Sequence, residues 1–161
     1  MAADYAGACG AIRQRFTDNW KVADVPITPV DYVNDSAPEP PVDPVSKRPI
    51  AWVFFEIVHN GSYIVGSGTP GQQTIVYDGF IKGHVYTPID TGTDDGLAKA
   101  VAIGEIFRNK RFYDGVTEGC YVRSGYDRNG QPRIDNGDVT SDDGQWFTTT
   151  ATIPFEYWHL G

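Results

Sequence analysis

The stretch from Ile75 to Phe107 constrains the fold most, because the patterns of a strand and of a helix meet there across one short junction. Residues 75–87 alternate with the two-residue period of a strand. The mainly apolar face of this strand contains Ile75, Tyr77, Ile81 and Val85. Pro88 and the Gly, Asp and Thr residues of 90–96 then end the strand, since these residues favour turns and helix N-termini. The sequence therefore predicts a long strand, a tight acidic loop and a helix in succession.

The helix after this loop is predicted to pack by one face. Its apolar residues recur at spacings of three and four. They are Leu97, Ala100, Val101, Gly104 and Phe107, with Ile103 and Ile106 widening the stripe. Thr93 or Asp94 is the expected N-cap, and Asp94 and Asp95 lie at the positive end of the helix dipole. The basic residues that follow the helix are Arg108, Lys110 and Arg111.

Composition indicates a single folded domain over residues 1–161. The chain is 40% hydrophobic and 13% aromatic, which is enough to bury a core without metals or disulfides. Its 18 Gly and 11 Pro predict many turns, and so a β-rich fold with few helices.

The rest of the chain divides into further predicted elements. A first helix is expected at 4–20, capped by Asp4, and strands are expected at 27–34, 120–126 and 145–158. Pro154 in the last of these is interpreted as marking an edge position or a bulge. The most apolar segment, 50–58, is predicted to be a central strand that closes in a turn at Asn60-Gly61, with 62–65 as its partner.

Three stretches are predicted to be loops. Residues 36–49 hold five of the eleven prolines and form an extended connector. Residues 66–73 form a flexible polar loop that leads into the long strand. Residues 127–144 form an acidic loop excursion that begins with a turn at Asn129-Gly130.

Charge and cysteine content exclude several classes of protein. The formal net charge of −8 argues against a dedicated nucleic-acid binder, although an acidic surface still lets DNA slide past by repelling it. Cys9 and Cys120 are expected to be reduced, because they lack a CxxC motif and because cytosolic disulfides are rare. No signal peptide is expected, because the N-terminal residues lack a basic region followed by an apolar core, and the longest apolar run, 50–55, is too short to cross a membrane. We therefore expect synthesis in the cytoplasm and no membrane contact.

No motif in the sequence predicts catalysis, a metal or a cofactor. The three histidines are isolated, and Asp127-Arg128-Asn129-Gly130 lacks the spacing of a calcium loop. The glycine-rich segment 66–71 lacks the Gly-Lys-Ser/Thr ending of a phosphate-binding loop. Paired carboxylates such as Asp94-Asp95 are better explained by helix capping than by acid/base chemistry. The chain is therefore predicted not to be an enzyme, with no catalytic, cofactor or metal residues.

Aromatic residues near the C-terminus allow two interpretations. They are Trp146, Phe147, Tyr157 and Trp158. One interpretation is a platform on which sugars stack, as in carbohydrate-binding modules. The favoured interpretation is core on one face and subunit interface on the other, because Trp and Tyr are enriched in both and no hydroxyl-binding pattern of Asn, Gln and Asp flanks them.

The order of the elements resembles a known family. The features concerned are Ile12-Arg-Gln-Arg-Phe16, Pro29-Val-Asp-Tyr-Val-Asn34, Pro38-Glu-Pro-Pro41, Trp52, Tyr77-Asp-Gly79, Val85-Tyr-Thr-Pro88, Gly92, Ile106-Phe107, Gly144-Gln-Trp146 and Thr152-Ile-Pro-Phe155. Together they resemble the tail-terminator, or tail-completion, proteins of long-tailed bacteriophages, prophages and gene transfer agents. The resemblance covers nearly the whole chain and consists of scattered residues without a catalytic signature. The excursion 127–144 is longer than this pattern leads one to expect.

The resemblance implies a fold and a function. It implies a single α+β domain, with a mixed, mostly antiparallel sheet of about five or six strands and two helices packed on one face. Six such domains would form a ring in the neck of the virion, at the head-proximal end of the tail tube. The partners implied are other copies of the chain, the tail tube protein and a head-tail connector or stopper protein, with DNA only as passing cargo.

Three exposed loops are the candidate subunit or tube interface. They contain Gly66, Ser67, Gly68, Thr69, Pro70, Gly71, Asp90, Asp94, Asp95, Asp127, Arg128 and Asn129. Two alternatives to a tail terminator stay open. One is another neck protein, a connector or stopper, and the other is a carbohydrate-binding or adhesion module.

Overall fold

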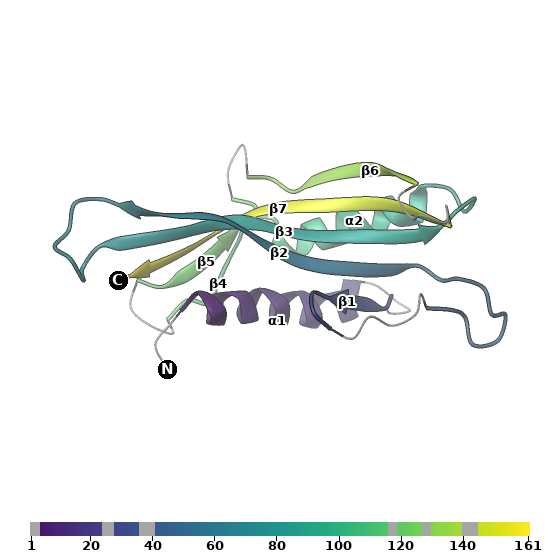
Figure 1. The fold of residues 1–161 in the computed structure, drawn as a ribbon, viewed down its shortest axis with the longest axis horizontal. Helices are drawn as coiled ribbons and strands as arrows, with labels where there is room; N and C mark the ends of the chain where they lie inside the picture. Colours follow the sequence, from purple (N-terminus) through teal and green to yellow (C-terminus); the bar gives the residue numbers. More distant parts are fainter. Residues whose placement is uncertain (1–3, 24–27, 36–40, 116–118, 127–129, 140–144) are drawn as a thin grey trace.

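The computed structural model describes residues 4–23, 28–35, 41–115, 119–126, 130–139 and 145–161. In these described residues, two helices and seven strands follow one another (Figure 1). In order they are α1 (Tyr5–Ala23), β1 (Val30–Tyr32), β2 (Trp52–Val65), β3 (Thr74–Pro88), α2 (Asp94–Phe107), β4 (Lys110–Phe112), β5 (Tyr121–Ser124), β6 (Arg133–Val139) and β7 (Trp146–Leu160).

All seven strands belong to one curled sheet with the order β1-β2-β3-β7-β5-β4, and β6 also pairs with β7. The pairing of β1 with β2 is parallel, and the other strand pairings are antiparallel. This confirms the predicted α+β class and the mixed, mostly antiparallel sheet. The long strands β3 and β7 pair along their whole lengths and form the centre of the sheet, with β2 beside β3.

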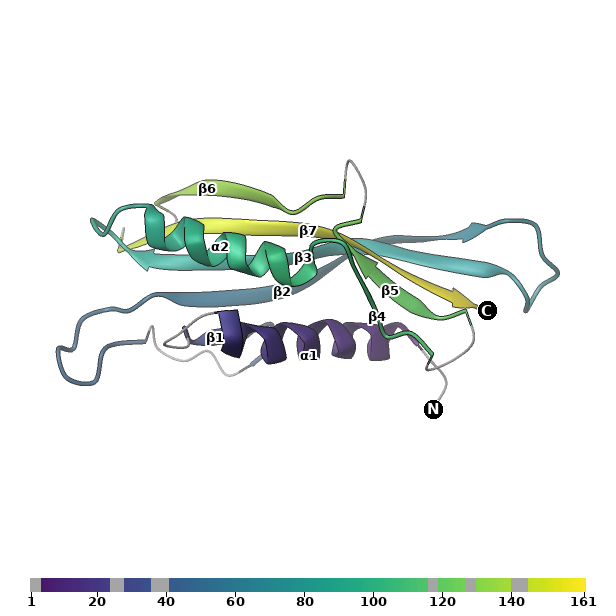
Figure 2. The same ribbon diagram turned by 180° about the vertical axis from the view of Figure 1, so that it is seen from behind.

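Both helices pack on the same face of the sheet, as predicted (Figures 1 and 2). From α1, the ring of Phe16 stacks on Phe55 of β2, with centroids 4.3 Å apart. From α2, Ile103 lies directly over Gly83 of β3, where the missing side chain lets the helix approach closely. The predicted stripe of α2 is only partly correct, because Val101 is 47% exposed.

The two helices begin in different ways. Asp4 caps α1 as predicted, since its carboxylate accepts a hydrogen bond from the backbone N–H of Gly7 at 2.6 Å. Thr93 occupies the N-cap position of α2, but its side chain makes no capping hydrogen bond. The expected position is therefore right for α2, while the capping contact is absent.

The predicted turn at Asn60-Gly61 is wrong. The strand β2 continues through these residues to Val65, with a bulge between His59 and Gly61, and the hairpin turns only at 66–73. The side-chain amide of Asn60 donates to the carboxylate of Asp78 across the pair at 2.8 Å. This cross-strand contact and a long partner strand outweigh the local preference of Asn-Gly for a turn.

The excursion predicted at 127–144 is wrong in part, because residues 133–139 form β6. The strand pairs with the first half of β7, and Ile134 lies opposite Ala151 and packs against the core. The backbone of Gly137 crosses so close to the carbonyl of Thr148 that a side chain would collide there. An acidic, glycine-containing sequence thus joins the sheet because one partly buried residue, Ile134, and one close backbone approach, at Gly137, favour it.

Pro154 was interpreted as marking an edge position or a bulge, but it lies in β7, which is a central strand. β6 pairs with residues 147–152 of β7, and β5 pairs with residues 155–158. Pro154 lies between these two registers, at a fork in the sheet. A residue without an N–H group is tolerated there because the ladder changes partner at that point.

Candidate subunit interface

The chemistry-bearing side chains of the described residues do not converge on a reactive centre. Among these residues, no group of three or more His, Cys, Asp and Glu side chains could hold a metal ion. In the same part of the chain, no helix is both long and apolar enough to cross a bilayer.

His84 shows how such side chains are used. It lies in the middle of β3 on the face of the sheet opposite the helices, where its Nδ1 lies 2.9 Å from the Thr150 hydroxyl and its Nε2 3.0 Å from the Glu56 carboxylate. Both ring nitrogens are therefore engaged with neighbouring strands. This arrangement fixes the imidazole across three strands.

The Cys9 thiol and the Tyr157 phenol are held in their protonated forms. Burial raises the pKa of the Cys9 thiol. Burial also raises the pKa of the Tyr157 phenol, which accepts a hydrogen bond from Cys120 Sγ at 3.5 Å. A raised pKa leaves little thiolate or phenolate, so these groups are poor nucleophiles at neutral pH.

The candidate loop at Gly66–Gly71 forms the tip of the β2–β3 hairpin (Figure 1). Gly66 and Gly71 have φ values of 88° and 87°, a conformation that glycine adopts without strain. The backbone N–H of Gln72 donates to the carbonyl of Thr69 at 2.9 Å. The tip is fully exposed, and it projects beyond the helices at one end of the molecule.

The candidate acidic loop lies at the other end of β3. Asp90 has a φ of 64°, and the hydroxyl of Thr91 donates to the carbonyl of Pro88 at 2.6 Å. Asp95 forms an ion pair with Lys99 at 2.7 Å, whereas Asp94 is exposed in the first turn of α2. These side chains stabilise the start of the helix, as the sequence suggested.

The structure does not bring the candidate loops together. The 66–71 loop and the 90–95 loop stand at opposite ends of β3, which has 15 residues and so spans roughly 50 Å. Asp127, Arg128 and Asn129 lie outside the described residues. Loops this far apart can contact different neighbours in an assembly.

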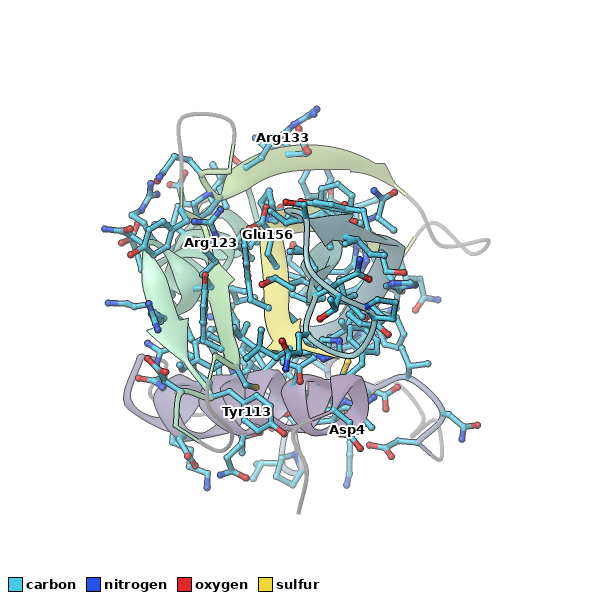
Figure 3. The ribbon with its side chains drawn as sticks, turned by 90° about the vertical axis from the view of Figure 1, so that its left-hand side faces the viewer. Asp4, Tyr113, Arg123, Arg133 and Glu156 are labelled. Carbon is cyan, nitrogen blue, oxygen red and sulfur yellow. The ribbon has the colours of Figure 1, made fainter. Side chains whose placement is uncertain are left out.

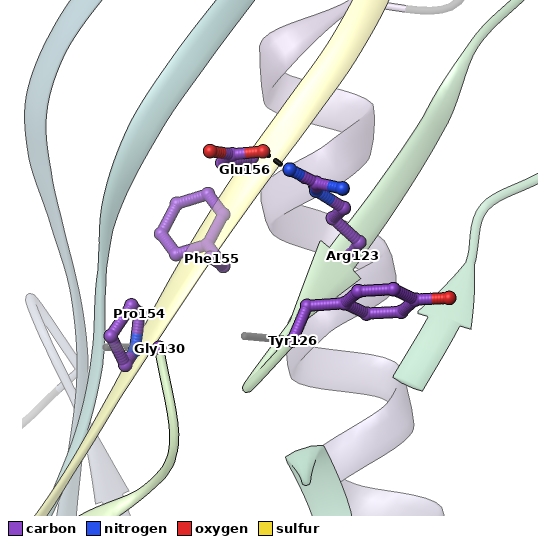
Figure 4. A pocket seen from close by; sticks show the side chains of 6 residues that line it. All are labelled: Arg123, Tyr126, Gly130, Pro154, Phe155 and Glu156. Carbon is purple, nitrogen blue, oxygen red and sulfur yellow. Dashed lines mark hydrogen bonds and ion pairs between the residues drawn. The ribbon is translucent and has the colours of Figure 1, made fainter. Parts of the chain in front are cut away.

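The face of the sheet opposite the helices carries a small pocket of about 60 Å³ (Figure 4). Its lining residues are Arg123, Tyr126, Gly130, Pro154, Phe155 and Glu156. The guanidinium of Arg123 pairs with the Glu156 carboxylate at 2.7 Å and lies 5.3 Å from the ring centre of Tyr126. Seen from the hairpin end, Arg123 and Glu156 lie on one side of the sheet, while Asp4 and Tyr113 lie beside α1 (Figure 3). The ion pair is satisfied within the sheet, so these six lining residues offer no converging set of unpaired groups.

The aromatic residues of β7 do not form a shared platform. Alternation along the strand places Trp146 and Trp158 on the face away from the helices, and Phe147 and Tyr157 on the helix side. Trp146 is only 5% exposed, and Tyr157 is completely buried. A sugar-stacking surface made of these four residues is therefore excluded by their positions.

One segment extends the predicted interface loop at 66–71 along the strand residues on either side of it. Residues 60–76, here called the arm, are the part of the β2–β3 hairpin beyond the rings of His59 and Tyr77, on which Tyr5 of α1 packs. Tyr63, Ile64 and Val65 in the arm are exposed. The incorrect turn at Asn60-Gly61 concealed this segment. A signal was present in the sequence, since no Asp, Glu, Lys or Arg occurs between Glu56 and Asp78.

Comparison with known proteins is informative about the fold. No family model matches the sequence, and a search of curated proteins finds no significant match. A solved structure, whose name states no function, is similar with a TM-score of 0.64 over 99% of this chain and 99% of that chain, at 18% sequence identity. At this level of identity the likeness shows that the two chains share a fold over their whole length.

Proposed function

We propose that this chain is a structural virion protein, a tail terminator that forms a ring at the head-proximal end of a tail tube. The ring ends tube polymerisation and joins the tail to the head connector. The proposal starts from the family resemblance in the sequence. The structural observation that supports it most is the exposed edge of β2 along the arm, which no other strand of the described residues pairs with, because such an edge is a liability on an isolated molecule.

The mechanism is geometric. Each copy presents edges and loops that the next copy covers, and closed cyclic symmetry leaves no edge open. Partners of the ring are the tail tube protein and a connector or stopper protein. The formal net charge of −8 per copy suits a ring through which DNA slides without binding, since phosphates are repelled by an acidic wall.

The proposal is tested by measuring the mass of the purified protein and imaging it by negative stain, alone and with polymerising tail tube protein. We expect closed rings of about six copies, either free or at tube ends, and tubes that stop growing once capped. A monomer that neither forms rings nor binds tube ends would contradict the proposal. Rings that bind a head connector but leave tube growth unchanged would favour the connector or stopper alternative.

A further inference from the structure

On its helix side, the arm lacks the layer of helices that covers this face of the sheet elsewhere, although Val76 at its base is buried. Tyr5 at the start of α1 packs on His59 and Tyr77, and the helix extends no farther toward the hairpin tip (Figure 1). Beyond this contact, Ile64 pairs with Ile75 across the hairpin, and Ile64 is 55% exposed. Apolar side chains are therefore exposed where neither helix covers them.

The arm also has an open strand edge. β1 pairs with β2 only at residues 53–55, so from Glu56 to Val65 the sole partner of β2 in the described part of the chain is β3. The outer backbone N–H and C=O groups of this segment therefore face no strand of the described residues. Over residues 59–65 the open edge measures roughly 23 Å. The group that satisfies such an edge is another extended strand.

Charged side chains are absent from the arm. Exposed edge strands of soluble proteins commonly carry Lys or other charges that prevent pairing with another chain. The whole protein is 21% charged, yet the segment between Glu56 and Asp78 contains no Asp, Glu, Lys or Arg. Depletion of charge combined with exposed aromatic and aliphatic side chains is typical of the centre of a protein interface.

We infer that the arm is the surface by which two copies of this chain associate, with the open edge of β2 taking a strand of the second copy. Charge identifies the occupant as a second copy. Two molecules of net charge −8 repel each other over most of their surfaces, and the arm is a contact that adds no like charges. The arm contains no Lys or Arg that could bind the phosphates of a nucleic acid. The inference rests on the proposed ring. It places the contact between subunits at the edge of β2, beside the predicted contact at 66–71.

The test compares two lysine substitutions at similarly exposed residues. Ile64→Lys places a charge in the arm, and Val101→Lys places the same charge on the outer face of α2, where Val101 is 47% exposed. Both variants should remain folded, which circular dichroism and urea unfolding check. By analytical ultracentrifugation, we expect I64K to weaken self-association at least about tenfold, while V101K matches the wild type, because a lysine at a desolvated interface lacks a partner.

Hydrogen exchange reports on strand addition itself. The amides of residues 59–65 should exchange more slowly in the wild-type assembly than in the I64K protein. If I64K assembles as the wild type does, or if V101K weakens assembly equally, the inference about the arm is wrong while the ring proposal stands. An arm-dependent dimer that never closes into a ring would support the inference and contradict the tail terminator. Wild-type protein that stays monomeric, or whose arm is protected only by tube protein, would overturn the inference.

Discussion

Individual residues determine how closely the helices approach the sheet in this protein. Gly83 is the clearest case, since a β-carbon there would lie 2.8 Å from Cδ1 of Ile103 in α2. Gly10 in α1 is the opposite case, because a β-carbon added there would meet nothing within 4 Å. Glycine at position 83 thus permits close packing of α2 on the sheet. Glycine at position 10 has no such role and only lowers the helix propensity of α1.

Alanine at these two glycines should therefore have opposite effects. Gly83→Ala is expected to lower the free energy of unfolding by about 1–3 kcal/mol, because the added methyl group overpacks the contact with Ile103. Gly10→Ala is expected to raise it by about 0.5–1 kcal/mol through helix propensity alone. Urea unfolding of both variants beside the wild type measures this. A stable G83A would show that α2 adjusts its position at little cost.

Buried tyrosines predict how stability depends on alkaline pH. Burial raises the pKa of Tyr157, and likewise that of Tyr5, above the ordinary value of 10.0. Above pH 10 the unfolded chain loses these protons while the folded chain keeps them, so stability is intact below pH 10 and falls as pH rises above it.

Tyr157→Phe should make this alkaline loss shallower. The change at pH 7 should be smaller than about 1 kcal/mol, because only a weak hydrogen bond from Cys120 is lost. Urea unfolding between pH 7 and pH 11 measures both quantities. Parallel loss of stability in the variant and the wild type would show that Tyr157 does not contribute to the effect.

At the scale of elements, the two helices differ at their N-termini. The carboxylate of Asp4 accepts a hydrogen bond from the N–H of Gly7. Thr93 makes no equivalent contact in α2. Asp4→Ala should therefore destabilise the protein by about 1 kcal/mol, whereas Thr93→Ala should change stability by only a few tenths of a kcal/mol. Thermal unfolding distinguishes the two, and equal losses would contradict the assignment of the caps.

How much of the fold the sequence predicts depends on whether local or distant contacts fix each element. Residues 4–20 and 75–87 have strong periodic patterns, so the predicted ends of α1 and β3 lie close to those observed. The sequence does not predict β6, because a residue on another strand, Ala151, supplies the partner of Ile134. The turn at Asn60-Gly61 is wrongly predicted for the same reason, since Asp78 lies far along the chain from Asn60.

The candidate interface shows a similar limit. Exposure of the loops at 66–71 and 90–95 followed from their polar and glycine-rich composition, and the structure shows both to be exposed. The part of the arm outside 66–71 was not predicted, because a turn was expected at Asn60-Gly61 and 62–65 was interpreted as the partner strand that follows it. Only the position of β1, which leaves most of β2 open on one side, shows that the arm is uncovered.

For the whole molecule, the charge distribution predicts how assembly responds to salt. Each copy carries a formal net charge of −8, and the arm carries none. Raising the salt concentration from about 0.01 M to about 1 M shortens the screening length from about 30 Å to about 3 Å. We expect the self-association constant to stay constant or rise over this range, since repulsion between copies weakens and no interfacial ion pair is lost.

Sedimentation at several salt concentrations tests this expectation. Dissociation of the assembly at high salt would show that ion pairs hold the copies together. In that case the acidic loop at 90–95 would replace the arm as the contact surface.

The fork at Pro154 separates the two ends of β7. One end pairs with β6 and the other with β5, while β3 pairs with β7 along its whole length. One edge of β7 is therefore divided between two partner strands, one near the hairpin and one near the acidic loop.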